Sequence, residues 1–351
     1  MRVWGITSGQ AGMVAQVRAL AQALEVVPQM KRIDIRAPFS LLPNIVFASP
    51  LRKVVLPCLT GDALCAPYPE LVISCGRRGA LAAMGMREML LSPPPAGGRV
   101  RVGDFVGRPS PEAPSPALPP AGGGGRTVFI HIQDPQLPAR YFDLVVAMRH
   151  DRITGPNVIK TRYALHAITP QALARARAEF EPVFAAYQGP RVAVLLGGST
   201  NKYRLGADGM RGVIASLKAL LAQSAGSLLI TPSRRTGQEN IRMLREAFSG
   251  DGRVYIYDFA GANPYMGLLA VADAIVATDD SVNMMSEAVA TGKPVYILKL
   301  PGHAHTKPAD FALGLLQEGA AREMDGRLEQ WEYAVGDEMG WLAGEVRGRL
   351  G

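Results

Sequence analysis

Short apolar runs alternate with amphipathic segments along nearly the whole chain. Runs of strand length lie at 2–7, 30–35, 71–75, 127–132 and 143–148, and again at 191–197, 227–232, 253–258, 273–278 and 294–298. Segments with helical spacing lie between many of them, for example at 12–25, 77–91, 208–223 and 237–248. Near-continuous Val/Ile/Leu strands joined by helices are typical of parallel sheets covered on both faces. The pattern therefore predicts an α/β fold.

The two halves of the chain resemble each other. Each opens with a strand and a glycine-rich loop, ITSGQAG at 6–12 and LLGGSTNK at 195–202. Each also has an apolar strand followed by two arginines, in LVISCGRRG at 71–79 and LLITPSRRTG at 228–237. Chance is the alternative explanation, because arginine is common in this chain. We interpret the echo as two tandem Rossmann-like lobes whose parallel sheets face a central cleft, since ligands bind at the carboxyl ends of strands in such sheets.

A chain of 351 residues suggests about two domains. We place the boundary between 187 and 188, which gives an N-terminal lobe at 1–187 on the acceptor side and a C-terminal lobe at 188–351 on the nucleotide-sugar side. The last helix is expected to pack back on the N-terminal lobe. Residues 92–125 are rich in proline and glycine and are interpreted as an excursion within the first lobe rather than a boundary.

Composition narrows the class of protein. The hydrophobic fraction is 48%, the net charge is +8, and the three cysteines, Cys58, Cys65 and Cys75, form no metal-ligand pattern or disulfide framework. The absence of a signal peptide pattern and of an apolar run near ~20 residues favours a cytoplasmic protein. A basic chain favours anionic partners. No nucleic-acid-binding module is recognisable, so small phosphorylated ligands fit better than nucleic acid.

The stretch TDDSVNMMSEAVATGKP, residues 278–294, predicts a helix with two distinct faces. Asp280, Asn283 and Glu287 share a polar stripe, and Ser281 is placed to begin the helix. Glu287 lies about 9 Å along the axis from Ser281, too far to close a capping box. A solvated helix face is the alternative to a binding stripe. The position of the helix, at the carboxyl end of a strand in the second lobe, favours the binding stripe.

Two glycine loops are candidates for phosphate binding. In the second lobe Gly197 and Gly198 let backbone N–H groups approach a ligand, followed by Ser199, Asn201 and Lys202. This loop lacks the ending of a nucleotide-hydrolysing P-loop. In the first lobe the loop has Gly9 and Gly12 but not the three-glycine dinucleotide fingerprint, which argues against a nicotinamide oxidoreductase. No metal-ligand spacing is found, so neither a metal site nor a cofactor is predicted.

The motifs GGSTNKY, ITPSRRT, HIQDP and NPYMGLLAVADAIVATDDSVNMMSEAVATGKPV resemble the mitochondrial fission Elm-type family, over most of the chain. The second lobe also resembles two-lobe (GT-B) glycosyltransferases, above all the N-acetylglucosaminyltransferase that completes lipid II. The resemblance implies that Gly197, Gly198 and Ser199 meet the diphosphate of a nucleotide-sugar donor. It also implies that the Asp280–Ser281 end of the helix faces phosphate and that Glu287 accepts hydrogen bonds from the ribose.

The arginine pairs are candidate phosphate partners. The resemblance makes Arg234 a diphosphate ligand, with Arg235 as the alternative that the sequence does not rank. Arg77 is the corresponding candidate in the first lobe. The lipid II enzyme carries a histidine after its first glycine loop, whereas this chain has Met13, which cannot move a proton. A general base is therefore expected elsewhere, first at Asp134, then at His131 or His150, at or just past first-lobe strand ends. Capping of a turn is the alternative for Asp134.

These features predict a metal-independent hexosyltransferase that uses a nucleotide-diphosphate sugar. The apolar segment 41–57, with Arg52 and Lys53 inset, suggests contact with an anionic membrane surface and a lipid-linked or envelope acceptor; a packed core helix is the alternative. The protein would then be peripheral on the inner face of the membrane. Two other functions stay open: epimerisation or hydrolysis of the sugar nucleotide on the same fold, and a non-catalytic membrane adaptor related to fission factors.

Overall fold

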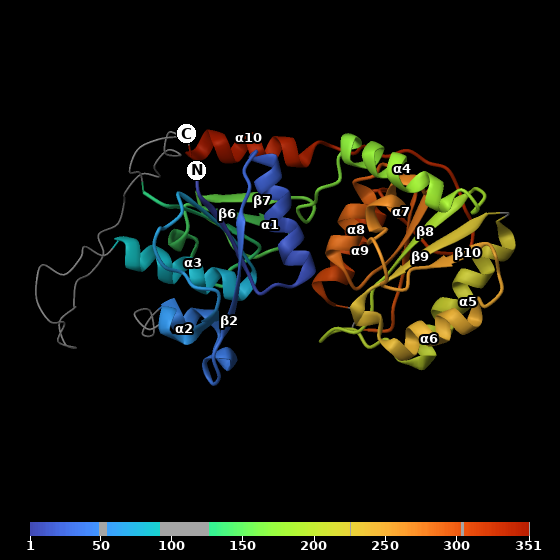
Figure 1. Cartoon of the computed structure of the whole chain (residues 1–351), viewed down its shortest axis with the longest axis horizontal. Coiled ribbons are helices and arrows are strands. Elements are labelled where there is room, and N and C mark those ends of the chain that lie inside the picture. The colour runs from blue at the N-terminus through green and yellow to red at the C-terminus, as the bar shows by residue number, and fades with distance from the viewer. Residues whose placement is uncertain (49–54, 92–125, 225, 303–304, 351) are drawn as a thin grey trace, which may run out of the picture. The chain divides into compact units, whose positions relative to one another are not determined.

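The computed structural model describes residues 1–48, 55–91, 126–224, 226–302 and 305–350 (Figure 1). The chain divides into two compact units, Met1–Leu165 with Asp337–Gly351, and His166–Gly336. The first division lies at Leu165 rather than at the predicted 187, because helix α4 (Pro170–Phe184) packs against helix α7 (Tyr265–Val271) of the second unit. Helix α10 (Glu338–Leu350) belongs to the first unit, where it packs on α1 (Ala11–Ala23) and strand β7 (Val158–Thr161).

The first unit is built on a seven-stranded sheet of order β3-β2-β1-β4-β5-β6-β7. All neighbours are parallel except β2 and β3, which are antiparallel. The other strands are β1 Val3–Thr7, β2 Gln29–Ile35, β3 Leu59–Gly61, β4 Leu71–Cys75, β5 Val128–Ile132 and β6 Leu144–Met148.

Helices cover both faces of this first sheet. On one face α3 (Gly76–Leu91) and α2 (Asn44–Ala48) bury a cluster that includes Ile6, Val72 and Phe129. On the other, α1 and α10 bury a cluster around Leu20, Ile73 and Val346. Alternate residues of β1 and β4 thus face opposite cores, which is why their sequences are apolar without a break.

The second unit is built on a six-stranded sheet of order β10-β9-β8-β11-β12-β13, parallel throughout. Its strands are β8 Arg191–Leu196, β9 Ser227–Pro232, β10 Val254–Ile256, β11 Ala274–Thr278, β12 Val295–Leu298 and β13 Arg322–Glu323. Helices α5 (Ala207–Gln223) and α6 (Gln238–Ala247) cover one face, where Leu217 and Leu244 are buried (Figure 1). Helices α8 (Val282–Val289) and α9 (Lys307–Gln317) pack against each other.

Each sheet has one point where the strand order reverses. It lies between β1 and β4 in the first unit and between β8 and β11 in the second. Connections from the two central strands leave in opposite directions there, and ligands of open α/β sheets bind at the carboxyl edge of such a point. In the second unit Leu195 of β8 pairs with Ala277 of β11, so the loops that follow these strands begin side by side.

The prediction of two α/β lobes with parallel sheets is confirmed, and the predicted strands and helices are present with small differences at their ends. The prediction that the two arginine motifs are equivalent in the two lobes is wrong. Arg77 follows β4, which lies beside the first strand at the reversal, whereas Arg234 follows β9, on the opposite side of its first strand. The excursion at 92–125 lies outside the described residues, as does 49–54 of the apolar segment. The described part of that segment buries Phe47 and Val55 in the core but leaves Ile45 exposed.

Candidate functional site

In the second unit, the glycine loop after β8 is hydrogen-bonded to the turn after β11. The N–H of Gly197 donates to Thr278 Oγ1 (2.8 Å), and the N–H of Gly198 donates to Asp280 Oδ2 (3.1 Å). The Thr278 hydroxyl donates in turn to Asp280 Oδ1 (2.7 Å). These two loop N–H groups, predicted to meet a diphosphate, are therefore engaged within the protein.

Asp280 occupies the centre of this arrangement. Its side chain is 0% exposed and forms a salt bridge with Arg235, whose Nη2 lies 2.7 Å from Oδ2 and whose side chain is 44% exposed. The N–H of Ser199 donates to the carbonyl oxygen of Arg235 (3.0 Å), so the loop is held from both sides. The structure therefore gives Asp280 and Arg235 a part in shaping the loop. Both arginines are exposed, and Arg234 has no partner among the described residues.

Both glycines of the loop lie too close to neighbouring atoms to be replaced by a residue with a side chain. A Cβ atom on Gly197 would lie 1.9 Å from Asp280 Oδ1, and one on Gly198 would lie 2.1 Å from the carbonyl oxygen of Arg235. Neither distance is compatible with a side chain. Glycine permits a close approach here, but by the protein's own backbone and carboxylate, and the predicted approach of a ligand stays a prediction.

Gly198→Ala is expected to lower the free energy of unfolding by about 2 kcal/mol, because the new methyl group displaces the Arg235 backbone. Urea unfolding followed by circular dichroism measures the change. Gly212→Ala is the matched control, since a Cβ atom on this exposed residue of α5 would have nothing within 4 Å. Replacement there should be neutral or stabilise the helix by up to ~1 kcal/mol. Equal stability of the two variants would contradict the packing of the loop.

The helix predicted within 278–294 is α8. Ser281 is its N-cap, with Oγ 3.5 Å from the N–H of Met284, as the sequence suggests. Met285 and Val289 are fully buried, so the face of α8 opposite the polar stripe packs into the core. Asn283, on the polar stripe, is half-buried. The first N–H groups of an α-helix have no acceptor inside the helix, so the start of α8 presents donors and the positive end of its dipole at the reversal of strand order.

Glu287, on the polar stripe of α8, is hydrogen-bonded to a residue of another helix. The Tyr265 hydroxyl, from α7, donates to Glu287 Oε2 at 2.5 Å. Desolvation raises the pKa of the half-buried Glu287 to about 7, and the bond from Tyr265 opposes that shift in part. Burial also raises the pKa of the Tyr265 phenol well above its usual value. Near neutral pH Glu287 is therefore divided between its neutral and its charged form.

The remaining predicted residues of the β8 loop face outward. Asn201 and Lys202 are exposed, and their neighbour Tyr203 is buried, with its hydroxyl 3.0 Å from Thr306 Oγ1. Tyr203 thereby fastens the far end of the loop, while Lys202 stays available to an anion.

In the first unit, the loop after β1 is closed by Met13. Gly9 has φ +80° and its N–H donates to Thr7 Oγ1 (2.9 Å), so glycine suits the turn. Gly12 lies in the first turn of α1. The Met13 sulfur lies 3.3 Å from Ser8 Oγ and fills the space where Gly76 would carry a Cβ. An apolar side chain therefore sits at the reversal of strand order in this unit.

Arg77 has a structural role. Its Nε donates to Asn44 Oδ1 (2.9 Å) and its Nη1 donates to the carbonyl oxygen of Ser40 (2.9 Å), while Nη2 donates to that of Leu42. The guanidinium thus fastens the segment around α2 to the start of α3. These partners leave the predicted role in substrate binding without support.

The three candidates for a general base differ in their surroundings. His131 is fully buried in β5, with Nδ1 2.9 Å from Ser74 Oγ, and desolvation lowers its pKa to about 3. A side chain so enclosed is not accessible to an acceptor substrate. Asp134 Oδ1 accepts the N–H of Gln136 (2.8 Å), which is the turn-capping role that stood as the alternative to catalysis. His150 lies on an exposed turn, with Nε2 3.9 Å from Asp151 Oδ1.

Two side chains at the second-unit site are not among the predicted residues: Thr278 and Tyr265. Lys293, which precedes β12, was not predicted either. Thr278 is a polar residue at the carboxyl end of an apolar strand, a position from which it could have been predicted as a site residue. Lys293 is half-buried, donates through Nζ to the carbonyl oxygens of Leu269 (2.5 Å) and Ala270 (2.7 Å), and has its pKa lowered to about 8 by burial. Nothing local in the sequence pairs Tyr265 with Glu287.

Neither a membrane-spanning helix nor a metal cluster is found among the described residues. Within 1–48, 55–91, 126–224, 226–302 and 305–350, no helix is both long and apolar enough to span a bilayer. Over the same ranges, no three His, Cys, Asp or Glu side chains gather closely enough to hold a metal ion.

The sequence matches the family described as "Mitochondrial fission ELM1" over residues 11–92 and 120–350. The mitochondrial fission protein ELM1 of Arabidopsis thaliana is 33% identical over 247 residues, which are 63% of this chain and 57% of the plant protein. The match thus spans little more than half of that relative. An uncharacterized protein of Rickettsia prowazekii (strain Madrid E), RP120, is 23% identical over 372 residues, which cover 95% of this chain and 94% of that protein.

Two solved structures share the fold. The UDP-GlcNAc 2-epimerase of Neisseria meningitidis bound to UDP-GlcNAc aligns with a TM-score of 0.50 and 13% identity, over 93% of this chain and 88% of that one. The S. aureus MnaA–UDP co-structure aligns with a TM-score of 0.53 and 10% identity, over 99% and 88%. At these identities the likeness is one of fold, and it confirms the predicted GT-B-like pair of Rossmann-like lobes.

Proposed function

This chain belongs to the mitochondrial fission ELM1 family, and we propose that its second unit binds a nucleotide-diphosphate sugar whose sugar is transferred to an acceptor hydroxyl. The observation that supports the proposal most is the junction at the β8–β11 reversal. There the glycine loop, the N-terminus of α8 and an arginine pair come together, with Glu287 further along α8. Open α/β sheets bind their ligands at this place.

A diphosphate would be held by hydrogen-bond donors that are not already bonded within the protein. Because Asp280 and Thr278 already accept the N–H groups of Gly198 and Gly197, the start of α8 and the exposed Arg234 are the groups proposed to meet it. Helix dipole and guanidinium together supply positive charge where the leaving diphosphate gains negative charge. This arrangement would need no metal ion. Glu287 is proposed to accept from the ribose hydroxyls.

In the proposed reaction, the acceptor hydroxyl oxygen attacks the anomeric carbon, the bond to the diphosphate oxygen breaks, and a base takes the hydroxyl proton. Asp134 and His150 remain the candidate bases, since His131 is enclosed. The net charge of +8 supports an anionic membrane surface as the place where a lipid-linked or envelope acceptor is met. The protein would then act at the inner face of the membrane.

Two other functions fit particular observations. One fold neighbour is named as a 2-epimerase and was solved with UDP-GlcNAc, which favours epimerisation or hydrolysis as the second candidate. Conversion of a bound sugar nucleotide without any acceptor distinguishes epimerisation from transfer. The plant relative is named for mitochondrial fission, which favours a non-catalytic membrane adaptor as the third. Liposome flotation without nucleotide binding would select the adaptor.

Calorimetric titration with UDP, GDP, CMP and their sugars tests the proposal. At least one nucleotide should bind, and Arg234→Ala should weaken its binding by about tenfold or more, because a charge-assisted contact to phosphate contributes ~1.5–3 kcal/mol. Arg245→Ala, at the other end of α6 on an exposed position, is the matched control and should bind as the wild type does. A folded protein that binds none of the nucleotides would refute the proposal.

A further inference from the structure

Tyr265 and Glu287 form a pair that the proposed function does not require. They come from different helices, α7 and α8, and are joined by the bond from the Tyr265 hydroxyl to Glu287 Oε2. Of the two carboxyl oxygens, Oε2 is taken by the phenol, while Oε1 accepts no hydrogen bond from another residue in the described part of the chain. The tyrosine thus fixes the plane of the carboxyl group through one oxygen.

We propose that Tyr265 is a positioning residue for ribose recognition: it holds Glu287 so that Oε1 accepts from the ribose hydroxyls of the nucleotide. This inference rests on the proposed function, because it assigns a task to the same site. A carboxyl group at the end of a glutamate rotates freely about its last torsion, so a free Glu287 would lose conformational entropy on binding. A fixed one would not, which is the general benefit of preorganisation.

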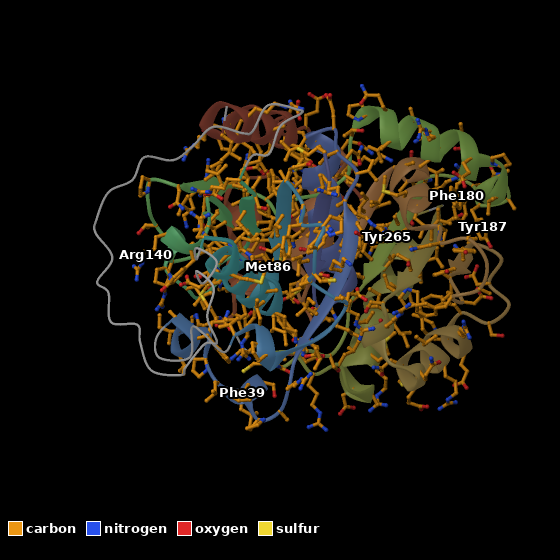
Figure 2. All side chains as sticks on the ribbon, turned by 60° about the vertical axis from the view of Figure 1, so that its left-hand side comes forward. Phe39, Met86, Arg140, Phe180, Tyr187 and Tyr265 are labelled. Atoms are coloured by element: carbon orange, nitrogen blue, oxygen red, sulfur yellow. The ribbon has the colours of Figure 1, made fainter. Side chains whose placement is uncertain are left out.

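The support for Tyr265 is itself rigid. α7 is packed so closely on α4 that a Cβ atom on Gly267 would lie 2.3 Å from the Phe180 ring. At the end of α7, Lys293 donates to the carbonyl oxygen of Leu269 (2.5 Å). Figure 2 shows the side chains of this unit, with Tyr265 and Phe180 labelled. A phenol held on such a helix orients its partner better than a side chain on a loop.

The test compares UDP with 2′,3′-dideoxy-UDP, which lacks both ribose hydroxyls. The wild type should prefer UDP by about tenfold or more, because a site built to bind a hydroxyl is left unpaired by an analogue without it. Tyr265→Phe should reduce that preference to about a third or less by weakening UDP alone. Adding Tyr265→Phe to Glu287→Ala should cost nothing further, since Glu287→Ala already removes the carboxyl group through which Tyr265 acts.

Tyr257→Phe is the matched control, because this buried tyrosine packs on Phe259 in the same unit and has no role in the proposed site. The preference of this variant for UDP over dideoxy-UDP should equal that of the wild type. Binding of dideoxy-UDP reports whether each variant keeps its fold. An unchanged preference in Tyr265→Phe, or an equal loss of both nucleotides, would overturn the role of Tyr265 while leaving the proposed function standing. Failure of the wild type to bind either nucleotide would overturn both.

Discussion

Asp280→Ala is expected to lower the free energy of unfolding of the second unit by about 3 kcal/mol. The carboxylate is 0% exposed, and its removal leaves the Arg235 guanidinium, the Gly198 N–H and the Thr278 hydroxyl without their shared acceptor. It also opens a cavity against Gly197, where a Cβ atom would lie only 1.9 Å from the vacated oxygen position. The substitution thus removes several buried interactions at once.

Urea unfolding followed by circular dichroism measures this loss, with two comparisons. Asp208→Ala removes an exposed carboxylate, 95% exposed and paired with Arg211 at the surface, and should cost no more than ~1 kcal/mol. Asp280→Asn keeps the shape and one acceptor oxygen, so it should fall between the two. If Asp280→Ala were as stable as Asp208→Ala, the buried network at the reversal of strand order would not exist in solution.

The strand pattern could be predicted because both sheets are covered on both faces. Runs such as LVISC and AIVAT bury every residue, so apolar continuity alone marks them. The short edge strand β13 escaped prediction for the opposite reason: both of its residues, Arg322 and Glu323, are exposed and carry no apolar signal. Glycine loops and the Asp-Asp-Ser helix start were also recognisable, since their chemistry is local.

Strand order is not local, and the error about the arginine pairs follows from it. LVISCGRRG and LLITPSRRTG look alike, yet β4 and β9 occupy different positions relative to the reversal in their sheets. The same order explains why the candidate site is richer than predicted. Thr278 reaches Gly197 only because β11 lies beside β8, and Tyr265 reaches Glu287 across 22 residues because α7 and α8 flank β11. Residue type indicated which side chains could bind a ligand, whereas the strand order determines which residues are in contact.

We expect the stability of the wild type to depend on pH near neutrality, and we expect Glu287→Gln to remove that dependence. The pKa of Glu287 is raised from 4.5 to about 7 in the folded chain, chiefly by desolvation. Its contribution is therefore fully favourable below pH ~4.5 and is lost as pH rises towards 7, because the unfolded chain releases the proton first. One pKa unit is worth ~1.4 kcal/mol, so with allowance for partial exposure the wild type should lose about 2 kcal/mol relative to the variant between pH 5 and pH 8.

Urea unfolding of both proteins at several pH values between 5 and 8 gives the difference, in which all other titrating groups cancel. Tyr265→Phe gives a second test. The Tyr265 hydroxyl donates to the carboxylate and lowers the Glu287 pKa, so loss of this hydroxyl should extend the fall in stability to higher pH. A difference that does not vary with pH would mean that Glu287 is solvated in the folded chain. A solvated Glu287 would have no desolvated carboxyl group to offer a ribose, so the outcome bears on binding as well as on stability.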